Sequence, residues 1–146
     1  MSNPEIAPDQ TTQKVRDACL CLHLQRAARR VARRFDAAFK PLGLKSGQFS
    51  LLMSLNRAAP ASIGQVSAVL AMDRTTLTAN LKPLCRRGFV EVSIDETDRR
   101  SRRLALTASG RALLAAAVPI WRATHAAIEG RVVEANRLRA DLRALC

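Results

Sequence analysis

The segment that decides the fold of this chain runs from Asp73 to Arg87 and reads DRTTLTANLKPLCRR. On a helix with 100° per residue, its leucines at 77, 81 and 84 fall on one stripe, which predicts a buried face. The opposite side carries small and hydroxyl-bearing residues near its start and cations near its end: Thr75, Thr78, Ala79, Lys82 and Arg86. Small residues let a helix lie deep in a groove, and cations meet phosphates at its rim. The segment therefore predicts a helix whose outer face meets a strongly acidic partner.

A second, shorter helix is predicted directly before this segment. Ser62 and Gln65 have the S-x-x-Q spacing of a capping box, which starts a helix. Its inward positions would be Ile63, Val66 and Leu70. A brief turn at 71–72 then joins the two helices with the spacing of a helix-turn-helix.

A β-hairpin is predicted directly after the segment. Gly88 is a good helix stop, and residues 89–94 alternate with a period of two, as a strand does. Residues 95–103 form a polar tip, and residues 104–106 supply the return strand. Together these elements predict a winged helix-turn-helix.

Long amphipathic helices are predicted on both sides of this core. Residues 12–40 repeat apolar side chains every three to four positions, and Pro41 disfavours helical geometry beyond Lys40. A short helix should follow from an N-cap at Ser46 to about residue 58. After the hairpin, Thr107 can cap a long helix that Pro119 should kink, and a last helical segment is predicted over 131–145.

The predicted fold class is thus mainly α with a small β-wing. Residues 1–11 would be a flexible tail and residues 12–146 a single domain. Within that domain, 46–106 would be the winged helix-turn-helix core, with 12–40 and 107–146 as flanking helices. Two long helices cannot bury their apolar stripes on so small a core, so an isologous dimer is expected.

Composition narrows the class of protein. The 146 residues include 24 Lys and Arg against 12 Asp and Glu, a net charge of +12, and 48% are hydrophobic. This predicts a globular protein that binds polyanions, although charge alone does not separate DNA from RNA or an anionic membrane. One Trp, four Phe and no Tyr offer no stacking platform for RNA. There is no phosphate-binding glycine loop or catalytic triad pattern, so no enzyme and no cofactor are expected.

The expected compartment is the reducing cytoplasm. No secretory leader and no run of about 18 apolar residues is present, which argues against a membrane protein. The four cysteines include no C-x-x-C pair and no zinc-finger spacing. Cys19 and His23 are four residues apart on one helix, but only His125 remains as a third ligand, so no metal is expected.

Several motifs in this order resemble the MarR family of bacterial transcription regulators. Their sequences are LGL at 42–44 with QF at 48–49, MDRTTLTANLKPL at 72–84, RGFV at 87–90, and DETDRRSRRLALTASG at 95–110. The resemblance covers about residue 17 to the C-terminus. It implies a homodimer that binds double-stranded DNA at a palindromic operator, usually to repress transcription, and leaves it on an effector or oxidant.

The resemblance also implies which residues contact DNA. Arg100 at the wing tip would enter the minor groove, held by an ion pair with Asp98, and the outer face of 73–87 would lie in the major groove. Position 79 is often basic in the family and is Ala79 here, which removes one expected contact. The predicted DNA-binding set is Ser62, Gln65, Arg74, Thr75, Thr76, Thr78, Ala79, Lys82, Arg86, Asp98, Arg99, Arg100, Arg102 and Arg103.

Two kinds of signal remain open for release from DNA. The first is a small aromatic or lipophilic ligand between the flanking helices and the winged core, with Cys21, Gln25, Phe49, Met53 and Trp121 as candidate lining residues. The second is oxidation of Cys21, whose position resembles the reactive cysteine of peroxide-sensing relatives. Those relatives support the thiolate with tyrosines, which this chain lacks, and a buried, unassisted thiol reacts slowly. A non-specific DNA-binding protein is a third, weaker alternative.

Overall fold

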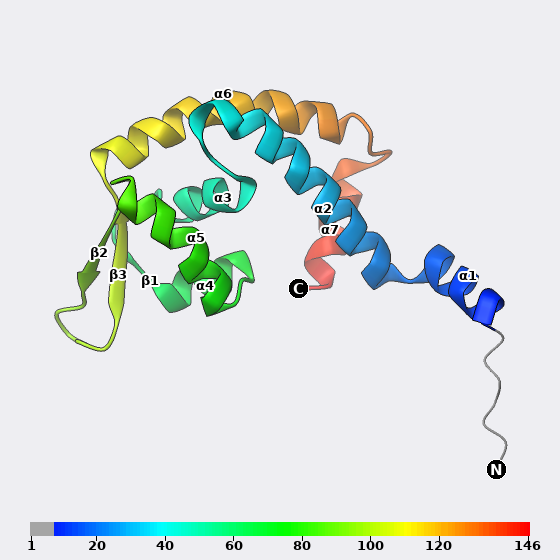
Figure 1. Ribbon diagram of the computed structural model, residues 1–146, viewed down its shortest axis with the longest axis horizontal. Helices are drawn as coiled ribbons and strands as arrows, with labels where there is room; N and C mark the ends of the chain where they lie inside the picture. The colour runs from blue at the N-terminus through cyan, green and yellow to red at the C-terminus, as the bar shows by residue number, and fades with distance from the viewer. Residues whose placement is uncertain (1–7) are drawn as a thin grey trace, which may run out of the picture.

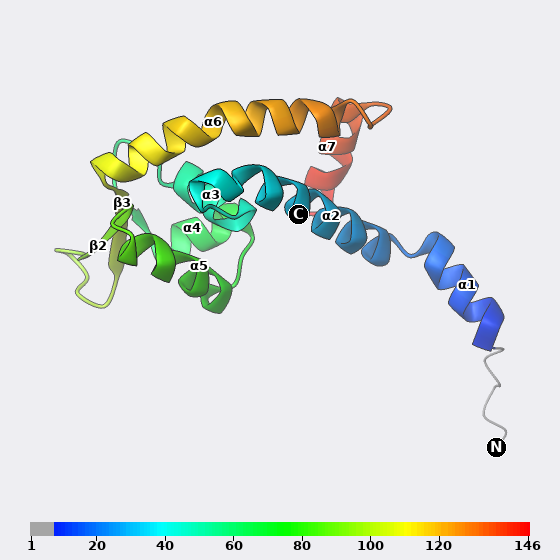
Figure 2. The ribbon, with the colours of Figure 1, turned by 45° about the horizontal axis from the view of Figure 1, so that its top comes forward.

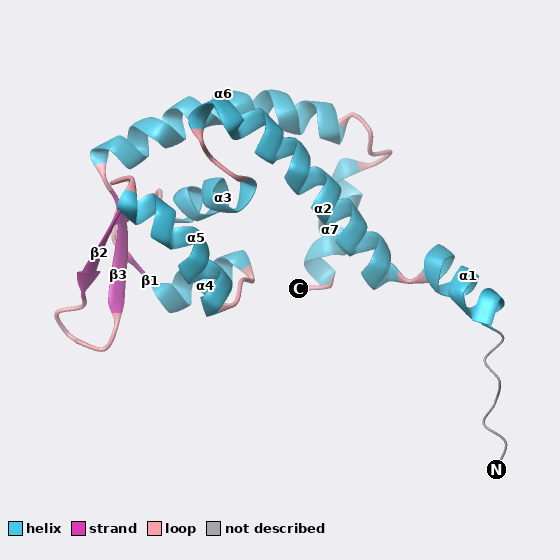
Figure 3. Cartoon of the chain, in the orientation of Figure 1, coloured by secondary structure: helices cyan, strands magenta, loops and turns pink. Residues whose placement is uncertain are grey.

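The computed structural model describes residues 8–146, which form helices and one small sheet at a corner of the molecule (Figures 1 and 3). The elements are α1 (Pro8–Ala18), α2 (Leu20–Phe39), η1 (Lys40–Leu42), α3 (Ser46–Ser54), β1 (Ala61–Ser62), α4 (Ile63–Leu70), α5 (Arg74–Arg86), β2 (Val90–Ile94), β3 (Arg102–Leu106), α6 (Ala108–Glu129) and α7 (Ala135–Ala144). This order confirms a mainly helical fold with a winged helix-turn-helix between long flanking helices.

Residues 46–106, which we call the head, pack around the buried stripe of α5. Leu77 and Leu84 are fully buried and Leu81 nearly so, as the sequence predicts. They share a single core with side chains of α3 and of β3, including Leu51 and Leu104. The end of α2 joins this core, because the buried ring of Phe39 stacks on Phe49 with 4.8 Å between ring centroids. Because the apolar face of α5 is buried in this core, its opposite face is exposed to solvent.

The wing is a three-stranded antiparallel sheet in the order β1-β3-β2. Val90 pairs with Leu106 and Val92 with Leu104, so the hairpin continues the core at its base. β3 begins at Arg102, two residues earlier than expected, and shortens the tip. The two-residue strand β1 was not predicted, because so short a strand exists only through its pairing of Ala61 with Leu104.

The predicted long N-terminal helix is two helices. Cys19 has extended backbone angles (φ −69°, ψ 110°), and its Sγ accepts the amide of Leu22 at 3.5 Å as the N-cap of α2. α1 begins at Pro8, within the segment expected as a tail, and the remainder of that segment (1–7) lies outside the described residues. The expectation of one continuous helix was wrong because a polar segment precedes the apolar stripe that starts at Leu20.

The other boundaries differ less from the prediction. α3 starts after Lys45 rather than Ser46 and ends at Ser54, four residues early. α6 starts after the expected cap, where Thr107 Oγ1 accepts the amide of Gly110 at 3.0 Å. It continues through Pro119 in a gentle arc and ends before Gly130 (Figure 1).

The start of α6 touches the base of the wing with no side chain between them. A Cβ built on Gly110 would lie 2.1 Å from the backbone oxygen of Phe89, so only glycine fits. Beside this contact, the hydroxyls of Thr107 and Ser109 donate to the Gly88 oxygen at 2.6 and 2.9 Å. The head is thereby joined directly to α6.

The terminal helices extend beyond the head. α2 runs alongside α6, whereas α1 projects away from the remainder of the subunit and α7 turns back from the far end of α6 (Figures 1 and 2). Arg139 of α7 contacts Glu129 of α6 at 2.5 Å, and this ion pair links the two helices. Within residues 8–146, no helix has both the length and the apolar character needed to cross a bilayer.

Candidate nucleic-acid interface

The start of α5 is fixed by Asp73. Its carboxylate accepts the Thr76 amide at 2.8 Å and the Thr76 hydroxyl at 2.7 Å. These two hydrogen bonds, the backbone one first, hold the pKa of Asp73 below its ordinary value. The anion lies at the positive end of the helix dipole, which favours the helix start. The hydroxyl proton of Thr76, a residue predicted to contact DNA, is therefore used in the cap, and its oxygen keeps its lone pairs as acceptors.

The outer face of α5 is an open depression of about 570 Å³. Six of the predicted DNA-contacting residues line it: Arg74, Thr75, Thr78, Ala79, Lys82 and Arg86. The Thr78 hydroxyl donates to the Arg74 oxygen at 2.7 Å and keeps its lone pairs available as acceptors. The Thr75 hydroxyl makes no hydrogen bond to another of residues 8–146. This face thus offers Arg74 and two hydroxyls at its start and two further cations at its end.

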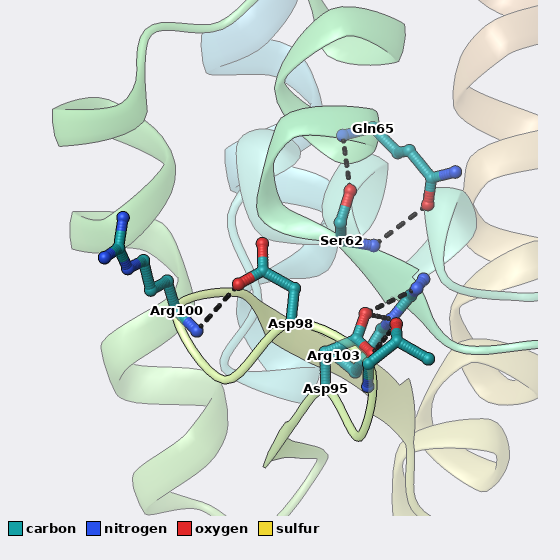
Figure 4. A network of polar contacts seen from close by, with 7 residues as sticks. Ser62, Gln65, Asp95, Asp98, Arg100 and Arg103 are labelled. Atoms are coloured by element: carbon teal, nitrogen blue, oxygen red, sulfur yellow. Dashed lines mark hydrogen bonds and ion pairs between the residues drawn. The ribbon is translucent and has the colours of Figure 1, made fainter.

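The capping box predicted at the start of α4 is confirmed (Figure 4). Ser62 Oγ accepts the Gln65 amide at 3.1 Å, and Gln65 Oε1 accepts the Ser62 amide at 2.9 Å. Both side chains were also predicted to contact DNA, and the structure shows them holding the helix start. The turn to α5 contains Ala71 with a φ of 48°, and the Ser67 hydroxyl donates to the Met72 oxygen across it.

A second cavity, of about 400 Å³, lies where the wing meets the two helices. Its lining comes from the start of α4, the outer face of α5 and the wing tip: Ser62, Ile63, Gly64, Arg74, Thr78, Asp98, Arg100, Ser101 and Arg102. Arg74 and Thr78 line both this cavity and the α5 depression. The two hollows therefore form one continuous basic surface.

The contact between Asp98 and Arg100 differs from the predicted ion pair. Asp98 Oδ1 accepts the backbone amide of Arg100 at 3.1 Å, and the backbone oxygen of Asp98 accepts the amide of Ser101 at 2.9 Å. The carboxylate thus shapes the turn, while the exposed Arg100 side chain extends away from it (Figure 4). The guanidinium of Arg100 is left available to an external anion.

Two of the four wing arginines bond within the hairpin. Arg103 donates from Nη2 and Nε to Asp95 Oδ2 at 2.6 and 2.7 Å. Asp95 also accepts the amide and hydroxyl of Thr97, and these bonds, followed by Arg103, lower its pKa to about 2. Arg102 Nη1 donates to the Arg99 oxygen at 3.2 Å. Arg103, which is also predicted to contact DNA, forms a local ion pair, because the hairpin brings Asp95 next to it.

The five candidate effector-pocket residues lie on three helices in different surroundings. Cys21 is exposed rather than buried, and its Sγ accepts Gln25 Nε2 at 3.5 Å on α2. Phe49 of α3 belongs to the core, whereas Met53 on the same helix is exposed. Trp121 of α6 is half-buried and stacks on His125 at 4.9 Å. Phe49 is therefore a packing residue within one subunit.

Long-range polar contacts were missed from the sequence. Asp36 of α2 accepts the Ser46 amide at 2.7 Å and so caps α3. Arg87, at the end of α5, donates to the backbone oxygens of Gly43 and Leu42 at 2.7 and 3.1 Å. No local spacing signals such pairs, since their partners are 10 and more than 40 residues away.

A family model described as the MarR family matches residues 42–101, which include most of the head. The transcriptional regulator MosR of M. tuberculosis, solved in complex with DNA, superposes with a TM-score of 0.80 and 38% identity. That match covers 87% of this chain and 92% of MosR.

Two curated relatives match over shorter segments. The transcriptional activatory protein BadR of Rhodopseudomonas palustris is 39% identical over 72 residues, which are 47% of this chain and 41% of BadR. The HTH-type transcriptional repressor NicR of Pseudomonas putida is 37% identical over 79 residues, or 54% of this chain and 50% of NicR. The matched segments thus span half or less of these relatives. All three proteins are named as regulators of transcription rather than as enzymes.

Proposed function

The chain belongs to the MarR family, and on that premise we propose that it is a sequence-specific DNA-binding regulator of transcription. The observation that carries this proposal is the continuous basic surface formed by the outer face of α5 and the wing tip. α5 has the small side chains that a helix needs to lie in a major groove. Arg99 and Arg100 lie at the wing tip, where they can reach the adjacent minor groove or its phosphates.

The remaining predicted contacts take two roles in this proposal. Arg74, Lys82 and Arg86 would meet phosphates at the groove rim, with Thr75, Thr78 and Ala79 toward the bases. Ser62, Gln65, Thr76, Asp98, Arg102 and Arg103 would hold the contacting elements in place through the hydrogen bonds described above.

The functional unit in this proposal is a homodimer. Large apolar side chains are exposed on α1, on the first turns of α2, and on α7 and its C-cap: Val15, Leu20, Leu24, Leu138, Leu142 and Leu145. A second copy would cover them through a two-fold interface. The same axis would place two α5 helices on a pseudo-palindromic operator, with half-site centres about 34–36 Å apart.

We propose that the dimer represses transcription and is released by a small aromatic or lipophilic ligand. The ligand would lie between α2, α6 and the head, with Gln25, Met53 and Trp121 toward it. Trp121 is the single tryptophan, so its fluorescence reports directly on this region. A screen of aromatic acids and their esters should find a compound that both changes this emission and weakens operator binding.

Oxidation of Cys21 is the second candidate signal, and the exposure of its thiol favours it. A hydroperoxide would transfer one oxygen to the thiolate, giving a sulfenic acid and an alcohol. If this is the signal, peroxide should release the wild-type protein from its operator and leave a Cys21→Ser variant bound.

The proposal is tested by selecting genomic fragments on the purified protein. A regulator should enrich a few fragments that share a pseudo-palindrome and prefer that duplex to a scrambled one by ~10³-fold or more. Equal affinity for the scrambled duplex would instead identify a non-specific DNA-binding protein. Sedimentation of the free protein and of the complex gives the number of subunits bound.

A further inference from the structure

Arg87 lies where the end of α5, the start of the wing and the link after α2 come together. Nη1 donates to the Gly43 oxygen at 2.7 Å and Nη2 to the Leu42 oxygen at 3.1 Å. Its guanidinium carbon also lies 4.8 Å from the centre of the Phe89 ring. One exposed side chain therefore connects the adjoining end of α5 and start of the wing to a segment more than 40 residues earlier in the sequence.

The backbone on the receiving side is shaped for this contact. η1 is capped at its C-terminal end by Gly43, whose φ of 63° is left-handed, and the carbonyl oxygens of Leu42 and Gly43 accept from the guanidinium. A Cβ on Gly43 would lie 3.1 Å from Arg87 Nη2, tighter than ordinary contact. Glycine thus allows both the turn and the close approach of the guanidinium. A cation at the carbonyl end of a helical turn is favourable, and two parallel donors fix its orientation.

Arg87 lies at the opposite end of α5 from the first DNA-facing residues, so a small rotation about Arg87 displaces those residues by several ångströms. α5 has 13 residues, so its DNA-facing start lies about 20 Å from Arg87. A rotation of about 10° at that end would move the start by about 3.5 Å, close to the ~3.4 Å rise of one base pair. α2, on the other side of the contact, carries part of the exposed apolar surface assigned above to the dimer.

We propose that Arg87 is a positioning residue that fixes the angle between α5 and α2, and so sets the spacing of half-sites that the dimer accepts. This inference rests on the proposed function. The residue acts through the orientation of α5 and not by contacting a base. Without its two hydrogen bonds, the two α5 helices of a dimer would sample a range of separations.

The test uses the operator duplex recovered by fragment selection, together with duplexes that carry one base pair more or fewer at its centre. Wild-type protein should bind the natural spacing at least 10-fold more tightly than either altered one. Arg87→Gln should reduce this ratio below about 3-fold, and Arg87→Lys, which keeps the charge but has a single donor nitrogen, should be intermediate. Arg122→Gln on α6 is the control, since it removes an exposed arginine from outside the junction.

The spacing ratio separates positioning from other roles. If Arg87 merely contacted a phosphate or stabilised the fold, the Arg87→Gln variant would lose the same factor of affinity at every spacing. The ratio between natural and altered spacings would then stay as in wild type, and this result would overturn the inference. Equal binding of wild type to operator and scrambled DNA would overturn the proposed function as well. A preserved operator preference with an unchanged ratio in Arg87→Gln would overturn the Arg87 inference alone. Thermal melts of each variant check that it is folded at the assay temperature.

Discussion

Replacing Arg100 by alanine tests the wing directly, and the structure allows its effect to be estimated. The turn around Arg100 is held by its backbone amide on Asp98, a bond that alanine retains. The removed side chain is exposed, and substitutions at such positions usually change stability by less than about 0.5 kcal/mol. Any large loss of operator affinity in Arg100→Ala must therefore come from a lost contact with DNA.

Two observable quantities follow from this loss. Each phosphate contact contributes about 0.9 to the slope of log affinity against log salt, so a dimer that loses one contact at each of two wings should have a slope shallower by about 1.8. The binding free energy of the dimer should weaken by a few kcal/mol, because each of the two lost arginine contacts contributes about 1–3 kcal/mol. Arg99→Ala should show a smaller change in both quantities.

The assay is fluorescence anisotropy of a labelled operator duplex, titrated with protein at several salt concentrations between about 50 and 300 mM. Arg122→Ala serves as the control, because it removes an exposed arginine of α6. If affinity and slope in Arg100→Ala are unchanged, or change no more than in Arg122→Ala, the wing does not take part in binding.

Three further predictions concern the fold and the assembly. Gly110→Ala should lower the Tm by about 5 °C or more in calorimetry, because its Cβ would overlap the Phe89 oxygen, and overpacking costs about 2 kcal/mol; an unchanged Tm would contradict the direct backbone contact. The pKa of Asp95 is lowered to about 2, so its ionised form stabilises the native wing above pH 3.8, and this stability is lost as the pH falls toward 2. Between pH 4 and 2, the Tm of wild type should therefore drop more steeply than the Tm of Asp95→Asn. Parallel curves of Tm against pH would refute this prediction. Leu142→Asp places a charge on the exposed face of α7 and should shift the protein toward monomers in sedimentation with weaker operator binding, whereas an unchanged dimer would exclude α7 from the interface.

Most of the head could be predicted because its signals are local. The Ser62–Gln65 capping box, the Asp73 cap and the leucine stripe of α5 each depend on residues three to seven positions apart. Side chains at such spacing meet as soon as the helix forms. The predicted cap at Thr107 is confirmed for the same reason, since Thr107 bonds to Gly110 three residues away.

The remaining features depend on contacts that no local pattern encodes. Strand β1 exists because Ala61 meets Leu104, and Arg103 turns to Asp95 because the hairpin brings them together. The break at Cys19 was not predicted because residues 12–18 contain no proline or glycine that would mark the end of a helix before Leu20. The bonds of Arg87 to Leu42 and Gly43 require the packed head before they can form.

The bare contact between Gly110 and Phe89 also bears on how a signal could travel. Where side chains lie between two elements, they can change rotamer and so absorb small displacements of one element. At this junction the backbones touch, and three hydroxyl and amide bonds secure the same spot. A ligand that shifts α6 by a fraction of an ångström would therefore move residues 88–89, at the base of the wing, by nearly the same amount.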